Sequence, residues 1–431
     1  MIRALVGLGA VAFLVGAGVM ATRTAPTTTE AEDAKATSVA RAQLARVTPA
    51  ARQNIDYQAL DARLQRLMQK ASMVGLAVGI VENGRITFLR GYGETLAGSG
   101  EQVTPETVFR WASVSKGVAS TMVAKLAEQG KISLGAPVAR YSSMRLPAGA
   151  EQSARVADVL SHRLGLYRNA YDNKLEEGQD PAFLRQTLAH LNLICPPGSC
   201  WSYQNVAYDA AAEIVSRGTG VTYQESTAAM LFRPIGMNSA SMTREGLMSA
   251  RSWARPHSAG GREAELNDIY YRVPAAGGVN SNIKDLSLWM LAQMGAMPDV
   301  VSPRVLQVIQ APLVQTPGER RRLRNFDRVT EAWYGYGWRS YNYAGQRVVG
   351  HRGGVRGFRS MIMFDPARKS GVVALWNSST SQPGGLEFEV MDMVYRLPFR
   401  DWLNIDEAGP PPGVAEDESA TNGGEGANRS R

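Results

Sequence analysis

Apolar residues recur at helical and strand-like spacing in the first part of this 431-residue chain. A helix is predicted over 57–71, where apolar side chains return every three or four positions. Two apolar runs follow at 75–81 and 86–89, and the Asn83-Gly84 pair between them is typical of a two-residue hairpin turn. The pattern therefore predicts a helix followed by an antiparallel pair of strands.

Helical periodicity then dominates the middle of the chain, and strand patterns return near its end. The expected helices are 113–129, 156–160, 181–191, 207–217, 223–231, 283–294 and 386–396. The expected later strands are 336–340, 347–349, 359–364 and 371–376. Strands from both ends around a helical middle predict an α/β (α+β) fold, in which one antiparallel sheet is flanked by terminal helices and carries a large, mostly helical insertion.

The two ends of the chain have a different composition. Residues 1–21 hold one Arg, an apolar run over 4–20 and small residues before a cleavage position after Ala21, which predicts either a secretory signal or a membrane anchor. Residues 22–50 are expected to be a linker, and 404–431 are expected to be a disordered tail, because the chain from Asp406 onward lacks apolar residues for a core. One folded domain over 51–403, with a helical subdomain at about 113–297, is therefore expected in the periplasm or outside the cell, free or held at the inner membrane through 4–20.

Charge and cysteine content narrow the class of protein. The net charge is +8, and its densest Arg run, 319–328, is expected to be a solvated surface loop, because no aromatic or nucleic-acid motif accompanies it. We therefore expect no nucleic-acid partner. Cys195 and Cys200 lie five positions apart around a turn sequence, and in an oxidising compartment they are expected to form a disulfide rather than two free thiols. No further ligands accompany them, so no metal site is expected.

One short motif carries candidate chemistry. Ser113 precedes Lys116 by three positions, so both lie on one face of the expected helix and the amine can reach the hydroxyl. A serine hydroxyl becomes a good nucleophile when a neighbouring base accepts its proton. The chain has a second Ser-x-x-Lys match at Ser281 and Lys284, where Ser281 is expected to cap a helix. Spacing alone does not choose between the two.

The choice between Ser113 and Ser281 is resolved by three motifs, which follow one another in the order known from a protein family. Ser113-Val-Ser-Lys116, Tyr203-Gln-Asn205 and His351-Arg-Gly353 resemble the Ser-x-x-Lys, Tyr-x-Asn and Lys- or His-x-Gly motifs of the serine β-lactamase and penicillin-binding protein superfamily. The likeness covers about 60–400 and is to the branch with class C β-lactamases, D-alanyl-D-alanine carboxypeptidases, D-aminopeptidases and esterases. Competing matches are judged less suitable by their context: Tyr167-Arg-Asn169, Tyr171-Asp-Asn173 and Lys369-Ser-Gly371.

The resemblance implies a role for each matching residue. Ser113 would form an acyl-enzyme, while Lys116 and Tyr203 would share the work of base and acid, with the base left open between them. Asn205 would orient the substrate amide and Lys116, and His351 would complete the polar network near Tyr203. The oxyanion hole and substrate contacts would come from the backbone N–H groups of Ser113 and Gly354, from close approach at Gly353, and from Arg352, which would meet a substrate carboxylate.

The resemblance also bounds the function. We expect an exported serine hydrolase acting on amide, peptide or ester bonds of a small molecule or a peptidoglycan peptide, with no cofactor, and most resembling a D-Ala-D-Ala carboxypeptidase. A class C-like β-lactamase or a carboxylesterase is the alternative within the enzymes, and a β-lactam or muropeptide sensor without turnover is the alternative outside them. Arg163 and Leu164 stand where the family often has two small hydroxyl residues, which leaves substrate preference open.

Overall fold

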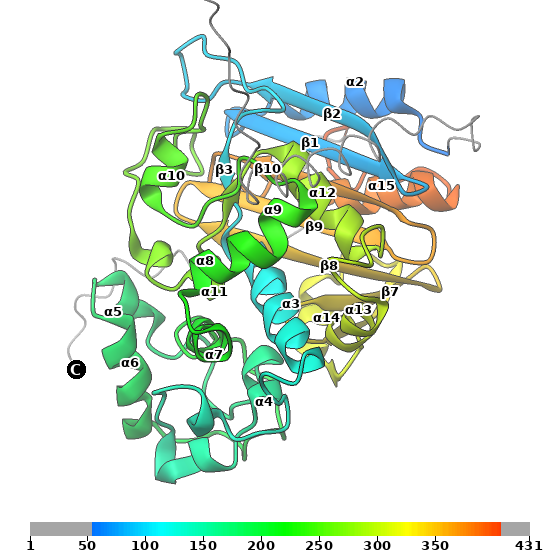
Figure 1. Cartoon of the computed structure of the whole chain (residues 1–431). Coiled ribbons are helices and arrows are strands. Elements are labelled where there is room, and N and C mark those ends of the chain that lie inside the picture. Colours follow the sequence, from blue (N-terminus) through cyan, green and yellow to red (C-terminus); the bar gives the residue numbers. More distant parts are fainter. Residues whose placement is uncertain (1–53, 407–431) are drawn as a thin grey trace, which may run out of the picture.

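The computed structural model of the chain describes residues 54–406 (Figure 1). The expected signal or anchor at 1–21, the expected linker at 22–50 and most of the expected tail lie outside the described residues. Within 54–406, no helix has the length and apolar character needed to cross a bilayer.

Eight strands form a single antiparallel sheet in the order β2-β1-β10-β9-β8-β7-β6-β5. The strands are β1 (Gly75–Glu82), β2 (Arg85–Gly93), β5 (Val314–Gln315), β6 (Val329–Tyr334), β7 (Arg339–Tyr343), β8 (Gln346–Val355), β9 (Phe358–Asp365) and β10 (Ser370–Trp376). Strand β1 pairs with β10, so the first and last long strands of the described residues lie side by side, next to the edge strand β2. The turn between β1 and β2 is Asn83-Gly84, both with positive φ, as the hairpin prediction requires.

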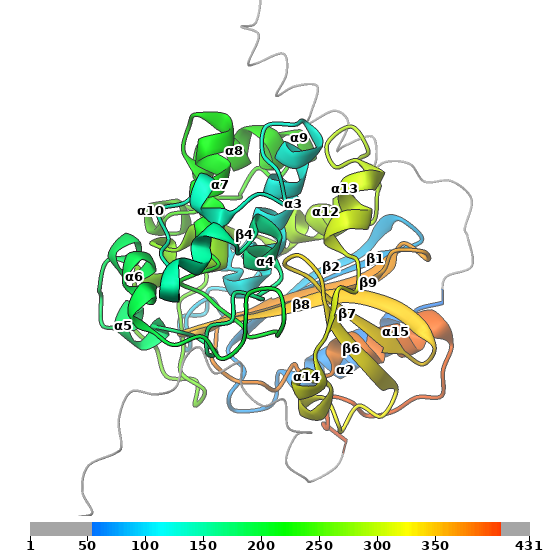
Figure 2. The same ribbon diagram turned by 90° about the horizontal axis from the view of Figure 1, so that it is seen from below.

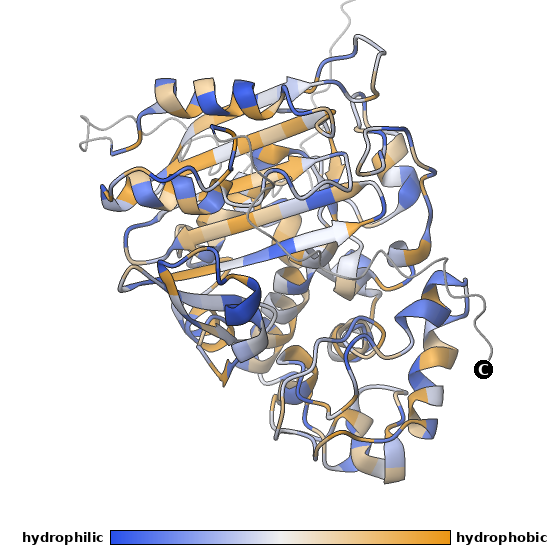
Figure 3. Ribbon diagram, turned by 180° about the vertical axis from the view of Figure 1, so that it is seen from behind, coloured by the Kyte–Doolittle hydropathy of each residue, from blue (hydrophilic) through white to orange (hydrophobic). Residues whose placement is uncertain are grey.

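The two faces of the sheet carry different layers. Helices α2 (Tyr57–Leu67) and α15 (Leu386–Tyr395) lie together on one face, and the helical part of the chain covers the other (Figures 1 and 2). The alternation of β10 shows the division, because Val372 packs in the core under the terminal helices while Val373 packs in the core shared with the helical part. Figure 3 shows the mixed polar and apolar surfaces of the two terminal helices. The predicted fold class is confirmed.

The helical part begins with β3 (Phe109–Arg110), a 3₁₀ turn at Ala112–Val114, and α3 (Ser115–Glu128). The remaining elements between the first and last strands of the sheet are α4 (Val156–Leu160), α5 (Asp172–Glu176), α6 (Pro181–Thr187), α7 (Ala210–Thr219), α8 (Tyr223–Thr227), α9 (Arg233–Ile235), α10 (Arg244–Met248), α11 (Pro274–Gly277), β4 (Asn280–Ser281), α12 (Ile283–Gln293), α13 (Pro303–Ile309) and α14 (Pro317–Arg322), with 3₁₀ turns at Val138–Arg140, Pro147–Gln152, Leu188–His190 and Ile269–Tyr271 and a π-helical turn at Ala228–Phe232.

Several predicted elements are corrected. The Arg run is a loop only in part: residues 319–322 lie in α14, where Arg322 pairs with Glu319, and 323–328 form turns that end at Arg328, which pairs with Asp392 of α15. The pattern also missed β6, and the strand expected at 336–340 begins only at Arg339. Residues 335–338 form a bend instead of a strand, because Gly335 N–H donates to Trp338 C=O within it.

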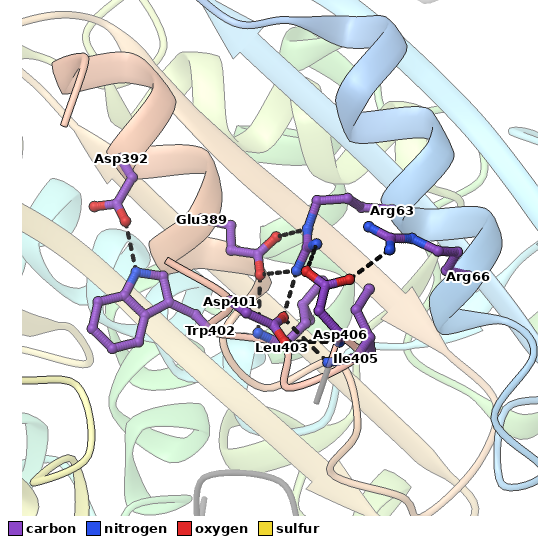
Figure 4. Close-up of polar contacts among 9 residues, drawn as sticks. All are labelled: Arg63, Arg66, Glu389, Asp392, Asp401, Trp402, Leu403, Ile405 and Asp406. Carbon is purple, nitrogen blue, oxygen red and sulfur yellow. Dashed lines mark hydrogen bonds and ion pairs between the residues drawn. The ribbon is translucent and has the colours of Figure 1, made fainter. Parts of the chain in front are cut away.

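The end of the described chain is tied to the first helix (Figure 4). Arg63 of α2 is buried and pairs with Glu389 of α15 at 2.6 Å. The same guanidinium pairs with Asp401 and Asp406, each at 2.6 Å. Asp406, in the segment where a tail was expected, is thus held against α2 by this ion pair.

Candidate active site

Ser113 lies in the 3₁₀ turn that leads into α3. The preceding Trp111 makes three hydrogen bonds that hold this turn in place. The Trp111 indole donates to Ser281 Oγ at 2.9 Å, and the Trp111 backbone N–H donates to Val279 C=O at 2.8 Å. The Trp111 carbonyl accepts a 2.5 Å bond from Ser360 Oγ of β9. Ser113 itself is 8% exposed, so the hydroxyl lies at the base of the site with a narrow opening to solvent.

Lys116 is the second residue of α3, one helical turn after Ser113, and it is fully buried. Its Nζ lies 2.7 Å from Asn205 Oδ1, 2.9 Å from Ala276 C=O and 3.4 Å from Ser113 Oγ. A neutral amine has two N–H donors and one lone pair. A charged Lys116 donates to all three oxygens, whereas a neutral Lys116 that donates to the two carbonyl oxygens would keep its lone pair for the Ser113 hydroxyl, as a general base requires.

Asn205 is oriented by a carboxyl group that the sequence did not reveal. Asn205 Nδ2 donates to Asp172 Oδ2 at 2.7 Å, which turns the Asn205 oxygen toward Lys116. Burial raises the pKa of Asp172 to about 6, against the lowering effect of the bond from Asn205 and of the charges on Lys116 and Arg168. Asp172 lies in a competing Tyr-x-Asn match, and no spacing rule connects it to Asn205.

Tyr203 packs beside Lys116 on the loop that follows the disulfide. Lys116 Nζ lies 4.6 Å from the centre of the Tyr203 ring, and the His351 ring centre lies 6.3 Å from it. The expected disulfide is present: Cys195 and Cys200 are bonded, which closes the loop just before Tyr203. The structure thus brings Ser113, Lys116, Tyr203, Asn205 and His351 into one cluster.

The loop around His162 is also part of this region. His162 is fully buried, and its ring centre lies 4.3 Å from that of Tyr203. Its neighbours Arg163 and Leu164 have structural contacts: Arg163 pairs with Asp158 at 3.3 Å and donates to Gly198 C=O in the disulfide loop at 3.3 Å, while Leu164 is buried in the core. Arg163 therefore supports the disulfide loop, while Leu164 contributes to the core.

Strand β8 supplies the third motif. An added Cβ on Gly353 would lie 2.3 Å from Trp111 C=O and 2.9 Å from Ser113 N, so only glycine lets β8 approach the nucleophile this closely. Gly354 is the next residue along β8, so its backbone is also close to the Ser113 turn. His351 points to the same face as Gly353, and its Nε2 lies 3.2 Å from Tyr334 Oη.

Arg352 lies on the other face of β8, and the role expected for it is corrected. Its guanidinium pairs with Glu387 of α15, with Nε at 2.5 Å from Oε1, and stacks near Phe388 at 5.9 Å. Alternation along a strand sends neighbouring side chains to opposite faces. Arg352 therefore points away from Ser113, toward the terminal helices, and does not meet a substrate there.

The competing motifs fall outside the cluster. Ser281 lies in β4, while Asn282 caps α12 by accepting from Asp285 N–H, so the cap expected at Ser281 is one residue later. Lys284 is exposed. Lys369 has positive φ in the turn between β9 and β10, as the hairpin interpretation requires. Tyr167 is 41% exposed, and Tyr171 directs its hydroxyl to Thr187 C=O at 3.3 Å.

Comparison with known proteins agrees with this geometry. A D-alanyl-D-alanine carboxypeptidase/endopeptidase of Escherichia coli strain K12 is 25% identical over 54% of this chain and 60% of its own length. An unguisins hydrolase of Aspergillus campestris is 25% identical over 74% of this chain and 61% of its own length, so the chain spans about three fifths of these relatives. A penicillin-binding protein homologue from Pyrococcus abyssi shares the fold, with a TM-score of 0.72 and 24% identity over 80% of this chain and 78% of its own.

A family model extends the match along most of the folded chain. The model described as Beta-lactamase matches residues 60–392, which include all three motifs. The expected resemblance is confirmed, and the chain belongs to the β-lactamase family, within the β-lactamase and penicillin-binding protein superfamily.

Proposed function

We propose that this protein is an exported serine hydrolase that forms an acyl-enzyme at Ser113 and removes the terminal residue of peptides ending in D-Ala-D-Ala. The observation that carries the proposal is the set of contacts at Lys116 Nζ, where two carbonyl oxygens and the Ser113 hydroxyl surround the amine. This arrangement supports transfer of the serine proton to the lysine, as acyl transfer requires.

The steps follow from these positions. Ser113 Oγ attacks the substrate carbonyl carbon while its proton moves to Lys116, and the backbone N–H groups of Ser113 and Gly354 stabilise the oxyanion. The C–N bond then breaks, and the leaving amine takes the proton by way of Tyr203. Water attacks the resulting ester along the same route and releases the shortened peptide.

A carboxylate-bearing substrate is favoured by the position of Arg168. The segment that carries it is held to the Tyr203 loop by three hydrogen bonds: Asn169 N–H to Tyr203 C=O at 2.8 Å, Ala170 N–H to Gln204 Oε1 at 3.3 Å and Gln204 Nε2 to Tyr167 C=O at 2.7 Å. The half-buried Arg168 guanidinium lies 5.7 Å from the Tyr203 ring centre. We therefore assign to Arg168 the carboxylate contact that the sequence suggested for Arg352.

One set of substrates tests the proposal. The purified protein is incubated with a peptide ending in D-Ala-D-Ala, with the same peptide amidated at its C-terminus, with a chromogenic cephalosporin, with a fluorescent penicillin and with a nitrophenyl ester. We expect release of D-Ala from the free acid, and loss of that activity in Ser113→Ala. Fast cephalosporin turnover without D-Ala release would indicate a β-lactamase, ester turnover alone an esterase, and stable penicillin labelling without any turnover a sensor.

Arg168→Ala separates the substrate class from the catalytic cluster. Hydrogen bonds to charged groups contribute about 1.5 to 3 kcal/mol, so KM for the free-acid peptide should rise about 10- to 100-fold. The activity on the amidated peptide should stay within about twofold, because that substrate lacks the carboxylate. Equal losses on both peptides would show that Arg168 supports the loop and does not recognise the carboxylate.

Export is proposed on two grounds: the apolar run at 4–20 and the Cys195–Cys200 disulfide, which is typical of oxidising compartments. Producing cells are fractionated, and the full-length protein is followed by immunoblot with and without reductant. We expect an oxidised protein in the periplasm, in the medium or, if 4–20 stays in place, in the membrane fraction after carbonate washing. A reduced protein in the cytoplasm would overturn this proposal.

A further inference from the structure

A chain of four hydrogen bonds runs beneath the catalytic cluster and connects two histidines through a tyrosine. Gln204 N–H lies 3.1 Å from His162 Nδ1, and His162 Nε2 lies 3.1 Å from Tyr334 Oη. Tyr334 Oη lies 3.2 Å from His351 Nε2, and His351 Nδ1 lies 2.7 Å from Arg352 C=O. His162, Tyr334 and His351 are all buried, with at most 2% of any residue exposed.

The two ends of this chain determine the proton positions between them. A backbone N–H can only donate, so His162 Nδ1 is an acceptor, and the neutral ring carries its proton on Nε2 and donates it to Tyr334 Oη. A backbone carbonyl can only accept, so His351 carries its proton on Nδ1 and its Nε2 is an acceptor. The Tyr334 hydroxyl accepts from His162 and donates to His351, which satisfies both histidines at once.

The electrostatic surroundings agree with neutral rings. Burial lowers the pKa of His162 well below its ordinary value, and the positive charges of Lys116, Arg339 and Arg168 lower it further. A second proton on His351 would fall on Nε2 and oppose the Tyr334 hydroxyl, which already donates there. The chain of bonds thus favours a single arrangement of protons.

The same groups touch the proposed acid. The His162 ring packs against Tyr203 at 4.3 Å between centres, and the Tyr334 ring meets Tyr203 edge-on at 6.5 Å. His351 lies beside Tyr203 on the β8 side. The rings of His162, Tyr334 and His351 therefore surround Tyr203 and connect the Tyr203 loop with β8.

We propose that His162 and Tyr334 are positioning residues that hold His351 in its Nδ1–H tautomer and hold Tyr203 against Lys116. In this arrangement His351 offers no proton to the leaving group and acts as a support for Tyr203. This inference rests on the proposed function only for its kinetic consequence, since the tautomers are a property of the resting protein.

Nuclear magnetic resonance of ring-¹⁵N histidine tests the tautomers without any substrate. The chain has four histidines, so single His→Gln variants can assign the signals. We expect Nδ1–H for His351 and Nε2–H for His162. His257 is an internal reference of the same kind as His351, because its Nδ1 lies 2.9 Å from Asn377 C=O and its Nε2 accepts from Ala97 N–H at 3.2 Å.

Tyr334→Phe removes the central hydroxyl and keeps the ring. We expect His351 to become a mixture of tautomers while the His257 signals stay unchanged. With a working substrate, kcat should fall about 5-fold with little change in KM, since one hydrogen bond contributes about 1 kcal/mol. Tyr341→Phe is the matched control, because it removes a buried tyrosine hydroxyl from β7 that bonds to Glu319 at 3.3 Å, outside this chain of bonds.

His162→Phe is the second variant, and thermal melts show whether each variant is folded. It keeps a ring beneath Tyr203 but cannot donate to Tyr334, so it should shift the His351 tautomer as Tyr334→Phe does. An Nε2–H tautomer for His351 in the unmodified protein would overturn the proposal, as would unchanged tautomers and kcat in Tyr334→Phe. Absence of activity on every substrate would count against the proposed function and would leave the tautomer result standing.

Discussion

The two faces of the sheet each bury a basic side chain, Arg63 on one and Lys116 on the other, but the surroundings of the two differ. On the face covered by α2 and α15, the Arg63 guanidinium meets the carboxylates of Glu389, Asp401 and Asp406 (Figure 4). On the other face, Lys116 Nζ contacts oxygens of Ser113, Asn205 and Ala276, and these three oxygens are uncharged. Asp172 is one step further away, behind Asn205.

This difference separates a structural charge from a catalytic one. Carboxylates raise the pKa of Arg63 further above its ordinary value, through bonds to Glu389, Asp406 and Asp401 that outweigh the effect of burial. An arginine so placed stays charged and holds the two ends of the domain together. A lysine among neutral oxygens can give up its proton and take it back, as acyl transfer requires.

The largest expected effect comes from keeping the charge of Lys116 and removing its ability to lose a proton. Lys116→Arg places a permanently charged group in the site, and proton transfer by a positioned side chain contributes about 100- to 10,000-fold to rate. We expect a loss of kcat/KM of this size on whichever substrate is turned over. Lys284→Arg, at the exposed lysine of the second Ser-x-x-Lys, is the control and should leave activity unchanged. A Lys116→Arg enzyme with more than a third of the original rate would contradict the role of Lys116 as the base.

Removal of the Arg63 charge on the other face should lower the stability of the protein and leave its catalytic activity unchanged. Arg63→Ala leaves the fully buried Glu389 carboxylate without its main partner, and breaking a buried ion pair in this way costs about 3 to 5 kcal/mol of unfolding free energy. Urea denaturation followed by circular dichroism measures the loss, and activity per folded molecule should be unchanged. Arg66→Ala is the control, because the Arg66 side chain is 50% exposed and its pair with Asp406 contributes at most about 1 kcal/mol.

The contrast between the two faces can be sharpened by measuring the free energy of unfolding of Asp172→Asn over a range of pH. The folded-state pKa of Asp172 is raised from 3.8 to about 6, so between these values the folded protein binds a proton that the unfolded chain has released. Asp172 should therefore make the free energy of unfolding fall as pH rises from about 4 to 6, and the variant should show a smaller fall, because Asp209 and Asp285, whose pKa values are also raised, remain. Above pH 6 the variant should be more stable by about 3 kcal/mol. Parallel stability curves would show that Asp172 is not held in this way.

The parts of the molecule that the sequence predicted are those encoded by local pattern. The Asn83-Gly84 turn, the strands near β9 and β10 and the terminal helices follow from periodicity and turn chemistry. Strand β6 was missed because it follows directly after an Arg-rich segment and carries polar residues at exposed positions. The ends of helices moved where 3₁₀ or π turns continue the chain, as after Thr187 and Thr227.

The residues of the candidate site also fall into those that the sequence predicted and those that only the structure reveals. Ser113, Lys116, Tyr203, Asn205 and His351 came from motifs, and the fold brings them together. Asp172 and Tyr334 act through partners distant in sequence, and no spacing in one chain reveals such contacts. Arg352 was misplaced because a motif gives the order of residues but not the face of the strand on which the side chain lies.

The smallest expected effect concerns the disulfide, which lies outside both charged clusters. Cys195→Ser with Cys200→Ser opens a short loop, and loop entropy predicts a loss of about 2 kcal/mol in the free energy of unfolding. The Tyr203 loop keeps two bonds to His162, from Ser202 N–H at 2.8 Å and Gln204 N–H at 3.1 Å, so kcat/KM should fall by less than about threefold. Thermal melts with and without reductant measure the first effect and steady-state kinetics the second. A large loss of activity with little loss of stability would instead make the disulfide a direct support of Tyr203, and the catalytic face would then depend on a covalent constraint as the other face depends on Arg63.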